Sequence, residues 1–302
     1  MLSSVSSSYK SNYNQRLSQH NVAFGSGGNE FVQVTPSDEF TSSASNQIVK
    51  KRNKNLLFAL GGLTLSGLGL FVGLKLGKTS QVNKALKTID ARFADLFADI
   101  PKARKTFGEV FLRDVSEEEA VEILKRYKEI EKLGVTAPKE EYFQALFKEA
   151  KHNYGFDSLP TEFKISDKPL AGNSNILGFT DPLGGVQIKS ALSKSEGFNT
   201  IHHELRHLKQ RYYAFHYAPS EYVKASQPKN FEIPQEVFEH VFGTPMGKSG
   251  IPKAHLEFAE NSAISVAKYK PVSESTSEYF AQWAEKDAYK AGNDIASFFG
   301  VA

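Results

Sequence analysis

Residues 200–210 read TIHHELRHLKQ, and within them His203, Glu204 and His207 form the pattern H-E-x-x-H. In an α-helix, residues four apart lie on the same face, so both imidazoles can reach one metal ion. The glutamate beside the first histidine is then directed toward a water on that ion. The segment therefore predicts a helix with a metal site, in which Glu204 is the general base.

The same segment carries an apolar stripe that would fix the helix in the core. Ile201, Leu205, Leu208 and Tyr212 follow one another at spacings of four, three and four residues. This is the period of a single helix face. The predicted helix thus buries one face and offers another for chemistry.

Further helices are predicted on the N-terminal side of the motif. Apolar residues recur at helical spacing in 83–99 and 117–132, and Ser116 with Glu119 forms a capping box at the start of the second. A third helix is expected over 138–152, because a proline is well tolerated at a helix start. We interpret these helices as a neck or a packing layer.

A short β-structure is predicted between these helices and the motif. Residues 161–188 contain the runs FKISD and NILGFTDPLGGVQIK. Asp-Pro and Gly-Gly separate two apolar segments, which predicts an antiparallel hairpin. Together with the helices, this indicates an α+β fold that is mostly helical.

Composition limits the chemistry of the site. The chain has 302 residues with 37 basic and 34 acidic side chains, a net charge of +3 that gives no reason to expect nucleic acid as a partner. The chain has no cysteine, which excludes disulfides, thiolate metal sites and a cysteine nucleophile. Any metal must therefore be held by His, Asp or Glu.

The N-terminal part of the chain differs in composition. Residues 1–50 hold 12 Ser, 5 Asn and 4 Gln without helical or strand periodicity, which predicts a disordered tail. The first 29 residues have basic but no acidic side chains, a weak likeness to an organelle transit segment. Residues 56–74 then run without a charge and could extend roughly 28 Å as a helix, so we expect a transmembrane helix over 55–77.

The flanks of this predicted span suggest its topology. Basic residues cluster more tightly before it, at 50–54, than after it, which favours a cytoplasmic tail and a C-terminal domain on the non-cytoplasmic side of the membrane. Gly69, Gly73 and Gly77 form a small-residue face that could pair two helices as a homodimer. The alternative is that such glycines simply accompany a loosely packed span.

The motif resembles that of the zincin metallopeptidases. The resemblance rests on IHHELRHLKQ and extends at most to the hairpin before it. The metzincin branch continues the motif with glycine at position 210 and histidine at position 213, whereas this chain has Gln210 and Tyr213. What remains is similar to the gluzincins, which implies that a glutamate from a later helix is the third ligand.

Several glutamates compete for this third position. The segment 277–289, SEYFAQWAEKDAY, predicts a helix, and its AEKDA core resembles the segment in which small gluzincins place the ligand, which assigns Glu285. Glu278 is the runner-up, and Glu257 and Glu260 on a preceding helix are further alternatives. Asp287 is a candidate for a hydrogen bond to a ligating histidine.

Other histidines and tyrosines near the motif have less defined roles. His202 lies on another helix face, where we expect a solvent-exposed or supporting group. His216, His240 and His255 are isolated and expected to be structural. A transition-state donor is usual in such sites, and the sequence leaves it open among these residues and the tyrosines, which are Tyr212, Tyr213, Tyr217 and Tyr279.

The segment between the motif and the third-ligand candidates is rich in proline. Residues 218–253 contain five prolines and cannot form one helix. We expect a short helix at 235–242 within a lid, a cleft wall or a plain surface excursion.

The resemblance implies a membrane-anchored zinc metallopeptidase that hydrolyses peptides or proteins. His203, His207 and Glu285 would hold Zn²⁺, and Glu204 would activate a water on it. One alternative is a membrane-anchored binding or adaptor protein with a structural or vestigial zinc site. Another is a helical adaptor without metal. The expected regions are the tail 1–50, the span 55–77, the helical region 80–155 and the zincin-like domain 156–302.

Overall fold

The structure of the protein is a computed structural model that describes residues 79–170, 176–228, 231–270 and 276–301. The described residues from Ser80 onward belong to one compact unit. The predicted tail 1–50 and the predicted span 55–77 lie outside the described residues. Within the described ranges, no helix has both the length and the apolar character needed to cross a bilayer.

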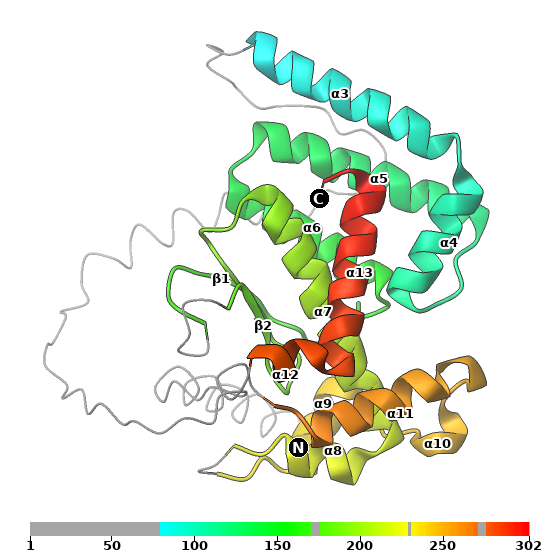
Figure 1. Cartoon of the computed structure of the whole chain (residues 1–302), viewed down its shortest axis with the longest axis vertical. Coiled ribbons are helices and arrows are strands. Elements are labelled where there is room, and N and C mark those ends of the chain that lie inside the picture. The colour runs from blue at the N-terminus through cyan, green and yellow to red at the C-terminus, as the bar shows by residue number, and fades with distance from the viewer. Residues whose placement is uncertain (1–78, 171–175, 229–230, 271–275, 302) are drawn as a thin grey trace, which may run out of the picture. The chain divides into compact units, whose positions relative to one another are not determined.

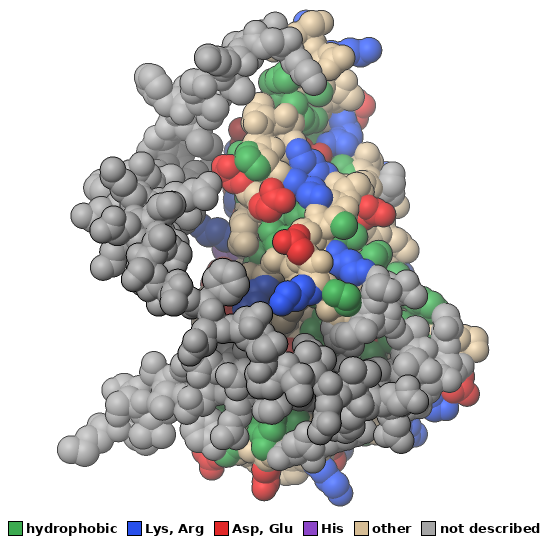
Figure 2. All heavy atoms as spheres, turned by 90° about the vertical axis from the view of Figure 1, so that its left-hand side faces the viewer, with side chains coloured by type: hydrophobic (Ala, Val, Ile, Leu, Met, Phe, Trp, Pro, Cys, Tyr) green, Lys and Arg blue, Asp and Glu red, His purple; other side chains and the backbone are tan. Residues whose placement is uncertain are grey.

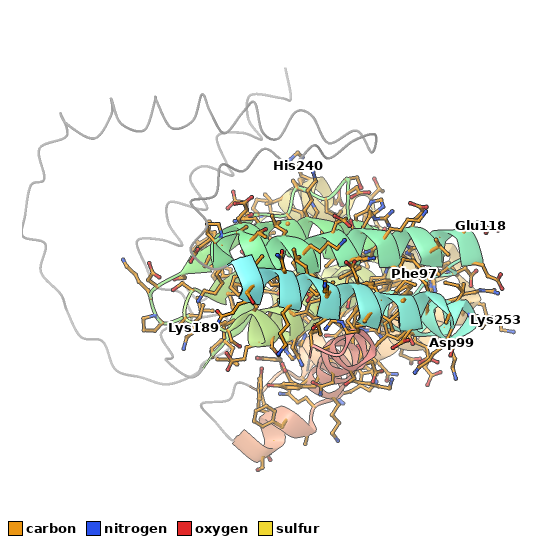
Figure 3. The ribbon with its side chains drawn as sticks, turned by 90° about the horizontal axis from the view of Figure 1, so that it is seen from above. Phe97, Asp99, Glu118, Lys189, His240 and Lys253 are labelled. Atoms are coloured by element: carbon orange, nitrogen blue, oxygen red, sulfur yellow. The ribbon has the colours of Figure 1, made fainter. Side chains whose placement is uncertain are left out.

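The unit begins with four helices (Figure 1). They are α3 (Thr79–Phe97), α4 (Ile100–Phe111), α5 (Glu117–Thr136) and α6 (Lys139–Asn153). The three predicted helices are confirmed as α3, α5 and α6, and the side chain of Ser116 caps α5 by accepting from the backbone N–H of Glu119. The sequence analysis missed α4, whose start is marked by an Asp99 cap and Pro101. Figure 3 shows Asp99 at the turn from α3 into α4.

The small sheet has three strands in the order β1-β3-β2. Strands β2 (Gly178–Thr180) and β3 (Val186–Lys189) pair antiparallel, which confirms the predicted hairpin, while β1 (Phe163–Ser166) pairs parallel with β3. The Asp181 carboxylate closes the hairpin turn, accepting from the N–H groups of Leu183 at 2.8 Å and Gly185 at 3.0 Å. The mixed sheet and the surrounding helices make the fold α+β and mostly helical.

The motif helix is α7 (Lys194–Tyr217), and it contacts helices from both ends of the unit. A capping box of Ser193 and Glu196 fixes its start. The predicted stripe is confirmed, because Ile201, Leu205 and Leu208 are fully buried. Helix α6 and strand β2 pack on α7 from one part of the chain, and α11 and α13 from another, so the helical region 80–155 and the C-terminal region share one core.

The described residues after α7 form six helices of very different lengths. They are α8 (Pro219–Ala225), α9 (Gln235–Phe242), α10 (Gly247–Gly250), α11 (Lys253–Ala267), α12 (Thr276–Ala281) and α13 (Trp283–Phe299). The predicted helix at 235–242 is confirmed as α9. It packs on the end of α7, where the rings of Phe215 and Phe242 lie 5.5 Å apart. The described parts of the proline-rich segment therefore contribute to the core.

The predicted helical segment 277–289 is confirmed except at Gln282, where it divides into two helices. Gln282 is extended, with ψ at 142°. Its side-chain amide bonds the backbone N–H and carbonyl of Lys270, both at 2.8 Å, and so ties the break to the end of the preceding segment. The break makes α13 a separate helix, and Glu285 lies in its first turn.

Surface charge is mixed on the face shown in Figure 2. Lys and Arg side chains alternate there with Asp and Glu, among the residues that the structure describes. Neither positive nor negative side chains dominate that face. The long-range electrostatic attraction that a strongly basic face exerts on phosphate chains is therefore weak there.

Candidate metal centre

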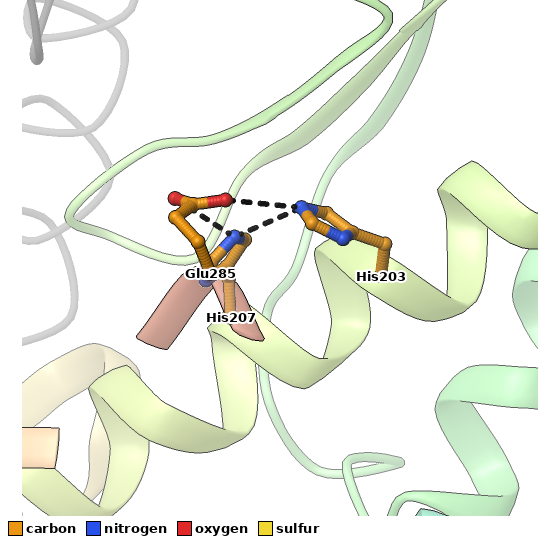
Figure 4. Close-up of side chains that lie close together, drawn as sticks. All are labelled: His203, His207 and Glu285. Carbon is orange, nitrogen blue, oxygen red and sulfur yellow. Dashed lines mark hydrogen bonds and ion pairs between the residues drawn. The ribbon is translucent and has the colours of Figure 1, made fainter. Parts of the chain in front are cut away.

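Three side chains from two helices converge on one point (Figure 4). His203 and His207 come from adjacent turns of α7, and Glu285 comes from the first turn of α13. The two Nε2 atoms lie 3.1 Å apart. Glu285 Oε2 lies 3.6 Å from His203 Nε2, and Glu285 Oε1 lies 3.5 Å from His207 Nε2. The packing of α13 along α7 thus brings residues 78 positions apart, 207 and 285, into one group.

The donor atoms fit a small tetrahedral cation. Metal bonds of about 2.0–2.2 Å at tetrahedral angles place neighbouring ligand atoms roughly 3.4 Å apart. The two Nε2 atoms are 3.1 Å apart, and each lies near this distance from a different oxygen of Glu285: Oε2 is 3.6 Å from His203, and Oε1 is 3.5 Å from His207. Glu285 Oε2 is also buried without a hydrogen-bond partner, an arrangement that is costly unless a cation uses it. The donor set of two imidazoles and one carboxylate therefore suits Zn²⁺, and Mn²⁺ or Co²⁺ could use the same ligands.

Burial and mutual charge set the protonation of the group. The side chains of His203, His207 and Glu285 are 10%, 15% and 2% exposed. Burial lowers the pKa of His203 to about 3, and the neighbouring His207 adds to this. Burial alone would also lower the pKa of His207, but the carboxylate of Glu285 outweighs it and raises that pKa to about 9. A positive charge is therefore favoured beside Glu285, in the place where a metal ion would supply it.

Strand β2 holds Glu204 beside this group. The hydroxyl of Thr180 lies 2.8 Å from Oε2 of Glu204 and 2.9 Å from its backbone oxygen, so it can donate to either. Burial raises the pKa of Glu204 to about 7, a value suited to taking up and releasing a proton near neutrality. A Cβ at Gly178 would lie 2.6 Å from Oε1 of Glu204, so only glycine lets the strand come this close.

A chain of hydrogen bonds on the Nδ1 side of His207 fixes the orientation of its ring. The Oε1 atom of Gln210 lies 2.8 Å from Nδ1 of His207, and an amide oxygen can only accept. Nδ1 therefore carries a proton, and in the neutral imidazole that a metal would bind, the lone pair of Nε2 is directed into the centre. The Nε2 group of Gln210 in turn donates to the Ala284 carbonyl and to Asp287 Oδ2, both at 2.9 Å.

Asp287 takes part in this chain but does not reach a histidine directly. Its two oxygens accept from Arg206 at 2.7 and 2.8 Å in a buried, bidentate pair. The sequence analysis considered a direct bond from Asp287 to a ligating histidine. The structure places Gln210 between them, because Asp287 lies on the face of α13 that meets Arg206 and Gln210 of α7.

The other glutamate candidates lie outside the group. Glu278 pairs with Lys270 at 3.0 Å on the surface. Glu257 and Glu260 are exposed on α11. The break at Gln282 separates Glu278 from Glu285, so the two do not share the helix face that a continuous helix would have given them.

The remaining histidines have structural surroundings. His202 lies outside the converging group, as expected, but it is not solvent-exposed: it is fully buried, and its Nε2 lies 3.1 Å from the Tyr127 hydroxyl. His216 Nε2 lies 2.9 Å from the Phe242 carbonyl, and His255 Nδ1 lies 2.7 Å from the Tyr213 hydroxyl. His240 is exposed and lies at the outside of the view in Figure 3.

Two tyrosines border the group. Burial raises the pKa of the Glu285 carboxyl, but His207, His203 and the nearby Tyr279 hydroxyl outweigh it and lower that pKa. The ring of Tyr289 packs edge-on against His203, with centroids 4.5 Å apart. The sequence analysis did not consider Tyr289, although its position four residues after Glu285 places both on one face of α13. Of the tyrosines it did consider, Tyr212 packs on Phe156 and His216, and the Tyr213 hydroxyl is paired with His255.

Comparison with known proteins returns no match from family models, curated proteins or solved structures. The resemblance to zincins therefore rests on the sequence motif alone.

Proposed function

We propose that the chain is a zinc-dependent metallopeptidase, with His203, His207 and Glu285 as the metal ligands. The observation that carries this proposal is the convergence of two imidazoles and one carboxylate, whose ligand atoms, one from each residue, all lie within 4.8 Å of one another. Glu285 is far from the two histidines in the sequence, so the three side chains meet only because of the fold. Local helix geometry explains the two histidines, but only the packing of α13 on α7 supplies the carboxylate.

The residues around the ligands support hydrolysis over a purely structural role. Structural zinc sites are closed by four protein ligands, whereas catalytic sites keep one position open. Among the residues that the structure describes, three groups meet here. A buried glutamate that is not one of these ligands, Glu204, lies beside them, and a structural site has no use for it.

The proposed reaction is the hydrolysis of a peptide bond. Bound zinc would polarise the scissile carbonyl and acidify the attacking water. Glu204 would accept the proton of that water and return it to the leaving amine. Thr180 keeps one oxygen of Glu204 in place, and the Gln210 amide keeps the proton of His207 on Nδ1.

We also propose a membrane location, a substrate class and a capacity for homodimer formation for the enzyme from its sequence. The apolar segment 55–77 would anchor the enzyme to a membrane, with the C-terminal domain on the non-cytoplasmic side. Peptides or proteins on that side would be its substrates. The glycine face of the span would permit a homodimer.

Metal analysis of the full-length chain, purified in detergent, tests the ligand set. We expect about one zinc per chain, and loss of binding in H203A and in H207A, because a site with two of three ligands holds the ion poorly. The pair E285Q and E278Q is matched in chemistry and differs in position. Only E285Q should weaken zinc binding, and equal binding by both variants would remove Glu285 from the site.

Hydrolysis of a mixed peptide library tests the reaction. E204Q should keep full zinc occupancy while hydrolysis falls by at least about 10²-fold, the usual scale for a general base. If the zinc-loaded wild type cleaves nothing, the alternative of a binding protein with a structural or vestigial zinc site is correct. If E204Q cleaves as fast as the wild type, the base has been assigned wrongly.

A further inference from the structure

Exposed apolar side chains gather around the metal centre. Six large hydrophobic residues are exposed within the described part of the chain: Leu177, Met246, Ile264, Tyr269, Phe280 and Tyr289. Of these six, Tyr289 contacts the ligand residue His203, Phe280 contacts Tyr289, and Tyr269 contacts Tyr279 next to them. Large apolar groups left in water beside a site commonly mark where a ligand binds.

The contacts trace a continuous path from the ligands to the surface. Tyr289, which packs on His203, is 40% exposed. Its ring lies 5.6 Å from that of Phe280, which is 44% exposed. Phe280 in turn lies 5.1 Å from the ring of Tyr279, whose hydroxyl lies beside Glu285. One aromatic surface therefore runs from the two ligand residues out to solvent.

Tyr269 extends this aromatic surface. It is 42% exposed, and its ring lies 6.2 Å from that of Tyr279.

We propose that Phe280 and Tyr289 form a subsite for an aromatic or large aliphatic side chain of the substrate, next to the scissile bond. This inference rests on the proposed function. An extended peptide advances roughly 3.3–3.6 Å per residue, so a carbonyl held at the metal places a neighbouring side chain within reach of a ring that touches His203. The two rings offer faces and edges for offset or edge-to-face packing, which an alanine side chain cannot use.

Equilibrium binding tests the subsite without catalysis. Phenylalanine hydroxamate and alanine hydroxamate share the zinc-binding group and differ only in the side chain. The zinc-loaded full-length protein should bind the phenylalanine compound about tenfold more tightly, the scale of one aromatic contact. F280A should lose this preference at unchanged zinc content, and F280L should keep part of it. The matched control is I264A, because Ile264 is 45% exposed but lies on α11, and its preference should equal that of the wild type.

Mapping of cleavage sites in a peptide library gives the second measurement. Sites cut by the wild type should be enriched in Phe, Tyr or Leu beside the scissile bond, and F280A should lose the enrichment while it still cleaves. A preference in binding without any hydrolysis overturns the proposed function and leaves the subsite intact. Hydrolysis with no preference, or an F280A variant that prefers phenylalanine as strongly as the wild type, overturns the subsite and leaves the function intact.

Discussion

Replacement of Gln210 by alanine isolates the part of the centre that holds His207 in position. Gln210 is buried and makes no contact with the point where the three ligand atoms meet. Its amide connects Nδ1 of His207 to Asp287 and to the Ala284 carbonyl. The substitution removes all three bonds and leaves the three ligands unchanged.

The size of the effect follows from the burial of His207. Its side chain is 15% exposed, so the Nδ1 proton has little access to water once Gln210 is gone. An unsatisfied buried donor costs about 1–3 kcal/mol, and loss of a group that orients a metal ligand typically weakens metal binding by about 10–100-fold. Loss of the two bonds from Gln210 to α13 should also weaken zinc binding, because α13 carries the ligand Glu285. We therefore expect a zinc Kd about 10–100-fold higher in Q210A.

Competition with a chelating dye measures this constant in Q210A and the wild type. Q235A is the control, since Gln235 also bonds through its amide, to Glu239 at 2.8 Å, but lies exposed on α9. Its zinc Kd should stay within about twofold of the wild type, the usual scale of a surface change. The reasoning is refuted if Q210A keeps the helical signal in circular dichroism and binds zinc as tightly as Q235A.

Three further predictions concern the strand beside the base, the buried ion pair and the anchor. In G178A the new Cβ would lie 2.5 Å from Thr200 Cγ2 and 2.6 Å from Glu204 Oε1 and would displace the base. We expect kcat/KM to fall at least about tenfold while metal analysis still finds zinc, and unchanged turnover would contradict this prediction. R206A leaves the Asp287 carboxylate buried without its partner and should lower the free energy of unfolding by about 3–5 kcal/mol, measured with denaturant on the metal-free protein; a loss under about 1 kcal/mol would mean that water replaces the guanidinium. Deletion of residues 50–78 should release the protein into the soluble fraction, and carbonate-resistant sedimentation of the shortened chain would disprove the anchor.

Much of the fold was predictable because its signals are local. The spacing of apolar residues predicts α3, α5 and the buried face of α7, Pro138 marks the start of α6, and the Asp-Pro and Gly-Gly pairs predict the hairpin turn. Helix α4 was missed, although its cap and proline are visible in the sequence. The break before α13 was missed because it depends on a side-chain bond from Gln282 to Lys270, 12 residues away.

The candidate metal centre was also only partly predictable from the sequence. Two imidazoles on one helix face follow from a spacing of four residues, which needs no knowledge of the rest of the chain. The sequence also placed Glu285 first among four glutamates, but by likeness to a family motif. The meeting of its carboxylate with the histidines depends on how α13 packs along α7.

The supporting groups were decided by the tertiary structure alone. Thr180 reaches Glu204 across 24 residues, and Asp287 reaches Arg206 across 81. Periodicity and capping describe interactions within a few residues, whereas these contacts depend on which faces of a strand and two helices meet in the folded core. The sequence by itself determined the chemistry that α7 can offer, and the packing of β2 and α13 against it decided which groups surround that chemistry.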